Sequence, residues 1–147
     1  MEKNGMQTVR DAQDRLREAG IRITTPRVVI YDFLLRNRIH PTCDEIYTAL
    51  KDKNPSLSLA SVYNVTERLS DENLLVRIVS PDGERHYDSV TEFHGHFFCR
   101  ECGKIYDIKS CPDSLFEEIP GAVTESISLT AEGLCPKCAP SSDKKKK

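Results

Sequence analysis

Residues Ser58 to Asp88 read SLASVYNVTERLSDENLLVRIVSPDGERHYD, and the hydrophobic spacing changes partway through this stretch. Up to residue 75 the apolar residues recur every three or four positions, which predicts an amphipathic helix with Ser58 as its N-cap. The buried stripe of this helix would consist of Leu59, Val62, Val65 and Leu69. From VRIVS onward the period is two, and PDGE supplies a turn before RHYDSV. The stretch therefore predicts a helix followed directly by a β-hairpin.

Three further helices are predicted before this stretch. The first has a single apolar face, made by Val9, Ala12, Leu16 and Ala19. Thr25 and Pro26 have the pattern of an N-cap and first-turn proline for a second helix that runs to about Arg36. Thr42 would cap the third helix, and Pro55 ends that segment. Three helices, a longer fourth helix and a β-hairpin follow the order of a winged helix, a helix-turn-helix variant whose last helix enters the DNA major groove.

The second half of the chain is richer in strands. HGHFF, KIYDI and VTESISLT have strand-like patterns, and one short helix is predicted from Pro112 to Ile119. We therefore expect an α+β protein with a winged helix-turn-helix domain at 1–87, a small α/β domain at 88–140 and a disordered basic tail at 141–147.

Composition restricts the class of protein without identifying a partner. The formal net charge of −2 gives no global argument for nucleic-acid binding. No apolar run approaches the roughly 18 residues of a membrane span, and MEKNGMQTVRDAQ lacks the apolar region of a signal peptide. We expect a cytoplasmic protein with no membrane partner.

Four of the six cysteines form two C-x₂-C pairs, Cys99/Cys102 and Cys135/Cys138. Six cysteines could also form a disulfide framework, but no export signal supports that alternative. Two C-x₂-C turns supply the four thiolates that Zn²⁺ prefers at structural sites. The pattern predicts a structural zinc site that joins the second domain to the end of its own chain.

A second set of donors is rich in nitrogen and oxygen. His94 and His96 are one residue apart on a predicted strand, so both side chains point to the same face. His40, Asp88 and Asp107 are further candidate ligands, although each by itself is also typical of a loop, a turn or a solvated strand end. Three imidazoles and two carboxylates suit Fe²⁺ or Mn²⁺ and tolerate Zn²⁺.

Several motifs together resemble the ferric uptake regulator family of bacterial metalloregulators. They are AGIRITTPRVVIYDFL, HPTCDEIYTAL, SLASVYNVTERLSDENLL, HGHFFCRECGKIYDI and GLCPKC, in the family's order, and the likeness covers residues 8–138. The resemblance implies an N-terminal winged helix, a C-terminal α/β dimerisation domain and a homodimer that binds operator DNA when its sensor site holds metal.

The resemblance also implies which residues form the sensor. The family's regulatory positions correspond to His40, Asp88, His94, His96 and Asp107 in this chain. Both acidic positions are aspartate, as in the peroxide-sensing PerR branch, whereas iron-sensing members more often have glutamate. The stretch VTESISLTAEGLC lacks the histidine that many iron-sensing members have before the last C-x₂-C, and the segment between residues 107 and 121 is shorter than in the family.

These assignments lead to a functional hypothesis. A metal held by residues of both domains would select one interdomain angle, and that angle would set the spacing of two recognition helices on a palindrome. The residues expected to contact DNA are Arg22, Ser61, Tyr63, Asn64 and Arg68. In the PerR-like reading, iron-catalysed oxidation of His40 or His94 would release the DNA.

Other functions remain open at this point. The nearest alternative is a repressor of the same family that responds to iron or zinc availability without oxidation. One further alternative is an enzyme whose metal activates water or oxygen. Another is a thiol redox switch that uses Cys43, Cys111 or the zinc cysteines. The winged-helix pattern favours a regulator, so we do not expect an enzyme.

Overall fold

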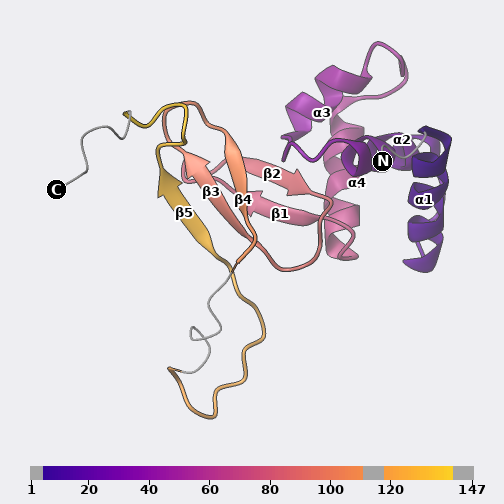
Figure 1. Cartoon of the computed structure of the whole chain (residues 1–147). Helices are drawn as coiled ribbons and strands as arrows, with labels where there is room; N and C mark the ends of the chain where they lie inside the picture. Colours follow the sequence, from indigo (N-terminus) through magenta and orange to yellow (C-terminus); the bar gives the residue numbers. More distant parts are fainter. Residues whose placement is uncertain (1–4, 111–117, 141–147) are drawn as a thin grey trace. The chain divides into compact units, whose positions relative to one another are not determined.

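The computed structural model describes residues 5–110 and 118–140, and the chain divides into two compact units after Thr91 (Figure 1). The sequence predicted that the second domain begins at residue 88. In the structure Asp88 is the last residue of strand β2 (Arg85–Asp88), three residues before the end of the first unit. Within the described ranges every helix is too short or too polar to cross a bilayer.

Four helices form most of the first unit, and they enclose one hydrophobic core. They are α1 Gly5–Glu18, α2 Thr25–Arg36, α3 Cys43–Leu50 and α4 Leu59–Asp71. Leu16, Ile30, Ile46 and Leu69 are all fully buried, so each helix contributes at least one side chain to this core. The apolar stripes predicted from the 3.6-residue period therefore face one another, as expected when helices bury their apolar sides together.

Side chains at the helix N-termini define where the helices begin. Thr42 accepts a hydrogen bond from the Glu45 amide while the Glu45 carboxylate accepts one from the Thr42 amide, so α3 starts with a complete capping box. Ser58 caps α4 as predicted. For α2 the predicted cap was wrong by one residue: Thr24 is the N-cap, and Thr25 is already helical.

A β-hairpin follows α4 and completes the winged helix. Strands β1 Val76–Val79 and β2 Arg85–Asp88 pair antiparallel, with Val76 opposite Asp88. Gly83 in the connecting turn has φ of +90°, a conformation that favours glycine. The predicted change from helical to strand period is confirmed, and the fold is α+β.

The second unit contains a three-stranded sheet with the order β4-β3-β5. Its strands are β3 Gly95–Cys99, β4 Ile105–Ile108 and β5 Thr130–Gly133; β3 pairs antiparallel with β4 and parallel with β5. Because β3 lies in the centre, the segments around both C-x₂-C pairs meet at its C-terminal end.

The predicted strand VTESISLT is wrong for all but its last residue. Residues 122–129 form no ladder, and the pairing with β3 begins at Thr130. Val123 is 88% exposed and Ile127 is 38% exposed, so the alternation in this segment creates no buried face. The predicted helix from 112 to 119 falls almost entirely on residues 111–117, and the predicted tail on 141–147; both lie outside the described residues.

We predict that Thr42→Ala lowers the free energy of unfolding of the first unit by about 1 kcal/mol, because the α3 capping box is lost. Urea denaturation followed by circular dichroism measures the change. Thr48→Ala is the matched control, since Thr48 is exposed on the same helix. Equal effects of the two substitutions would show that the cap contributes nothing specific.

Candidate metal centres

Four cysteine sulfurs converge at the C-terminal end of β3. Cys99, Cys102, Cys135 and Cys138 each offer a sulfur, and the four atoms lie within 4.8 Å of one another. The Cys102 and Cys135 sulfurs are 3.8 Å apart. Strand register brings the two pairs together, because Cys99 lies opposite Gly133 and Cys135 follows two residues later. Four thiolates on two tight turns fit tetrahedral zinc.

Backbone amides favour the thiolate form that a zinc ligand requires. The amide of Cys135 donates to the Cys99 sulfur at 3.3 Å. Hydrogen bonds from the backbone of Cys102, and then of Cys135, lower the pKa of the Cys99 thiol to about 6. Gly103, with φ of +74°, turns the chain back toward β4 after the first pair. Cys99 is thus prepared to bind a cation, whereas hydrogen bonding with the Cys135 side chain raises the pKa of the Cys138 thiol to about 12.

The first unit contributes two of the predicted nitrogen and oxygen donors. His40 lies in the loop between α2 and α3, and its Nε2 is 3.3 Å from the Asp88 carboxylate on β2. Both residues are buried. His40 has φ of +53°, the left-handed region that is uncommon for residues other than glycine, and three contacts from β2 hold the loop there.

Those three contacts come from consecutive residues of β2. The His86 ring donates from Nδ1 to the His40 carbonyl at 2.8 Å, which requires the proton on that nitrogen. The Tyr87 amide donates to the Pro41 carbonyl at 3.0 Å. The Asp88 carboxylate faces His40 Nε2 and also accepts from the Val90 amide at 2.8 Å. Contacts from β2 therefore hold both members of this donor pair in place.

The second unit contributes the other three donors. The His94 and His96 rings are 4.5 Å apart between centroids, and their Nε2 atoms lie 3.4 and 3.8 Å from one carboxylate oxygen of Asp107. Asp107 sits directly opposite His96 across β3 and β4. His94 Nδ1 is 2.8 Å from the Glu92 carbonyl, so that nitrogen carries the proton and Nε2 keeps its lone pair for a metal.

Gly95, between the two histidines, has a packing reason to be glycine. A Cβ at this position would lie 2.7 Å from a side-chain carbon of Leu129. The His96 amide donates to the Leu129 carbonyl at 3.0 Å, so the segment entering β5 lies directly against this part of β3. The H-x-H motif thus needs a residue without a side chain in its middle.

The predicted DNA-contact residues lie on one helix and one loop of the first unit. Tyr63, Asn64 and Arg68 are exposed on α4, and Ser61 is half-buried next to the cap, where its hydroxyl contacts Ser58. Arg22 is exposed in the loop between α1 and α2. Arg68 is 3.0 Å from Glu72.

The sequence did not point to His86, Tyr87 or Glu67 as functional residues. His86 and Tyr87 contact the loop at His40, and Glu67 of α4 contacts Tyr87. The alternation in RHYD could have indicated that Tyr87 points to the face opposite His86 and Asp88. Nothing in the sequence indicates that the His86 side chain bonds a backbone carbonyl 46 residues away.

Comparisons with known proteins give one consistent result. The model of the ferric uptake regulator family matches residues 18–129. The peroxide operon regulator of Bacillus subtilis is 33% identical over 135 residues, which covers 89% of this chain and 93% of the relative. The structure of PerR from Streptococcus pyogenes, studied for peroxide sensing and gene regulation, matches with a TM-score of 0.51 and 32% identity, over 90% of this chain and 93% of its own.

The fold alone is also shared with the ferric uptake regulator of Helicobacter pylori. That structure has a TM-score of 0.75 at 21% identity and covers 96% of this chain and 97% of its own. The family match extends over most of the chain and includes both compact units. The chain therefore belongs to the ferric uptake regulator family.

Proposed function

We propose that the protein is a metal-dependent transcriptional repressor that acts as a homodimer on palindromic operator DNA in the bacterial cytoplasm, and that peroxide releases it. One observation carries the proposal: in the winged-helix unit His40 lies 3.3 Å from Asp88, and Asp88 is the last residue of a strand of the wing. A metal ligand in that position links metal occupancy to a DNA-binding element. The relatives named as peroxide regulators support the choice of signal.

Zinc has a structural role in this proposal. Cys99, Cys102, Cys135 and Cys138 would hold it in a closed tetrahedral site with no position left for another ligand. The site would fix β5 and the C-terminal segment against β3. Thiolate ligands suit Zn²⁺. They suit Fe²⁺ or Mn²⁺ less well in a site that must release its ion.

The regulatory metal would be Fe²⁺ or Mn²⁺, held by His40 and Asp88 of the first unit with His94, His96 and Asp107 of the second. Each set is too small by itself for a metal that takes five or six ligands, whereas together they supply three imidazoles and two carboxylates. Binding would then favour one orientation of the two units.

DNA recognition would use the exposed side of α4 and the loop before α2. Asn64 can pair with the edge of adenine, and Tyr63 can contact a thymine methyl group. Ser61 and Arg68 are suited to phosphate or base contacts. Arg22 would enter an A·T-rich minor groove, where the narrow groove concentrates negative potential.

Peroxide would act on a histidine ligand. Bound Fe²⁺ supplies the redox chemistry that activates H₂O₂, and Mn²⁺ does not. One oxygen atom of H₂O₂ is inserted into a ring C–H bond of His40 or His94, and the other leaves as water. The altered ring donates more weakly, the units lose their fixed orientation, and the DNA is released.

A second candidate function is a repressor that responds to iron or zinc availability without oxidation. The same ligands and the same DNA surface would serve it. The response of the iron-loaded protein to peroxide separates the two functions.

We predict that Cys135→Ser removes about one equivalent of zinc per chain, because one of four thiolates is lost. Elemental analysis of the purified full-length protein measures the metal. Cys43→Ser is the control, since Cys43 is buried in the first unit beside Thr66 and lies outside the cluster. Full zinc retention in the Cys135 variant would refute the structural assignment.

We predict that Asp88→Asn and Asp107→Asn each abolish most of the increase in DNA affinity caused by Mn²⁺, because each removes a charged ligand. Fluorescence anisotropy measures this with a duplex selected from a random library by the wild-type protein. Asp52→Asn, an exposed residue after α3, is the control. Both variants should retain zinc; an unchanged Mn²⁺ effect would exclude these ligands.

We predict that H₂O₂ treatment of the Fe²⁺-loaded protein adds one oxygen atom to His40 or His94 and lowers DNA affinity. Peptide mass spectrometry locates the addition, and the Mn²⁺-loaded protein serves as control because it lacks that redox chemistry. If the iron form keeps both its histidines and its DNA affinity, the function is metal-availability sensing instead.

A further inference from the structure

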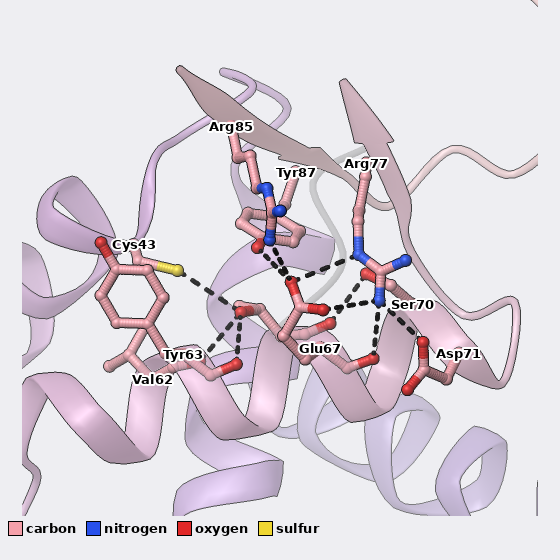
Figure 2. Close-up of polar contacts among 10 residues, drawn as sticks. Cys43, Val62, Tyr63, Glu67, Ser70, Asp71, Arg77, Arg85 and Tyr87 are labelled. Carbon is pink, nitrogen blue, oxygen red and sulfur yellow. Dashed lines mark hydrogen bonds and ion pairs between the residues drawn. The ribbon is translucent and has the colours of Figure 1, made fainter. Parts of the chain in front are cut away.

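Glu67 of α4 contacts both strands of the wing (Figure 2). Its carboxylate accepts hydrogen bonds from Arg77 of β1, at 3.3 Å from Nε and 2.8 Å from Nη2, and from the Tyr87 hydroxyl of β2 at 3.0 Å. Arg85 of β2 adds a longer ion pair at 3.5 Å. Glu67 lies on the same helix as the proposed base-reading residues, so these contacts join that helix to the hairpin.

The contact with Tyr87 differs from the two ion pairs. The arginine side chains are 35% and 63% exposed, and exposed ion pairs are weak and sensitive to salt. Tyr87 is 1% exposed, so its ring is fixed by packing. Of the residues bonded to Glu67, Tyr87 is the most buried.

The same strand holds the first-unit metal donors. His86 and Tyr87 bond the carbonyls of His40 and Pro41 at 2.8 and 3.0 Å, and Asp88 faces His40. The Tyr87 backbone thus contacts the sensor loop while its side chain contacts α4. A displacement of β2 would change both sets of bonds, because Tyr87 takes part in both.

We infer that Tyr87 and Glu67 are positioning residues that couple the His40–Asp88 donor pair to the orientation of α4 on DNA. The inference rests on the proposed function, since it concerns how metal occupancy reaches the DNA surface. It adds a connection inside the winged-helix unit, independent of the angle between the two units. Coupling of this kind requires an element whose state both sites influence, and β2 is that element.

A simpler role for Glu67, the neutralisation of charge, would have a different effect on DNA affinity. Its carboxylate also neutralises two arginines of the wing, and removing it would leave Arg77 and Arg85 free to attract phosphate. In that case Glu67→Gln raises DNA affinity equally with and without metal, because charge attraction does not depend on metal. Positioning instead changes the ratio of the two affinities.

The decisive variant is Tyr87→Phe, which removes the hydroxyl and leaves the charge and the ring in place. In the full-length zinc-containing protein, we expect the Mn²⁺-dependent gain in DNA affinity to fall about 5-fold or more, while the affinity without Mn²⁺ stays within about 2-fold of wild type. Glu67→Gln should lower the same ratio. Tyr31→Phe, another buried tyrosine but on α2, is the matched control and should leave it unchanged.

Hydrogen exchange of the α4 amides, measured without DNA, separates failure of this inference from failure of the proposed function. We expect Mn²⁺ to slow their exchange in the wild type and in Tyr31→Phe but much less in Tyr87→Phe. An equal Mn²⁺ effect on α4 in Tyr87→Phe and wild type, or none in wild type, overturns the inference. If Mn²⁺ slows α4 exchange in the wild type without changing DNA affinity, the proposed function fails while the connection stands.

If Tyr87→Phe unfolds, Glu67→Gln and Asp71→Asn carry the comparison. Asp71 also accepts from Arg77, at 2.7 Å, and each substitution removes one negative charge from α4. The inference is supported if the ratio of DNA affinity with Mn²⁺ to that without Mn²⁺ falls in Glu67→Gln but not in Asp71→Asn. Equal ratios in both variants and the wild type overturn it.

Discussion

The bonds between β2 and the loop at His40 are the constraint on which the first unit depends. They hold a histidine in a left-handed backbone conformation, and one of the same residues faces its ring with a carboxylate. Without β2 the loop would be free to adopt the extended conformation that residues before proline prefer. The wing therefore also positions a pair of candidate metal donors, His40 and Asp88.

In the second unit a single strand and its two neighbours position two groups of candidate ligands. One strand, β3, carries His96 near its start and Cys99 at its end. Register with β4 supplies Asp107, and register with β5 brings in the second cysteine pair. Hard and soft donors stay separate because they lie at opposite ends of this strand. Each metal can therefore be selected by its own ligand chemistry.

The sequence was most informative where one signal determined the structure. The helices follow from apolar residues that recur every three or four positions, and each helix buries at least one of them: Leu16, Ile30, Ile46 and Leu69. The C-x₂-C pairs predicted a cysteine cluster that the structure contains. The prediction failed where pairing with another strand determines the conformation. Residues 123–129 alternate like a strand but form none in the described part of the chain, whereas TAEG forms a strand that pairs with β3.

The donor set illustrates the same limit more finely. Resemblance identified the candidate residues, but not how the fold divides them between the two units. That division depends on hydrogen bonds of His86 and Tyr87 to backbone carbonyls more than 40 residues away. Backbone acceptors leave no trace in residue identity, so such bonds are invisible in a single sequence.

The close approach of Leu129 to Gly95 connects the two groups of donors in the second unit. The segment that packs over the H-x-H motif continues into β5 and then into Cys135. Any ion that held the four cysteines together would therefore also hold this segment over the two histidines.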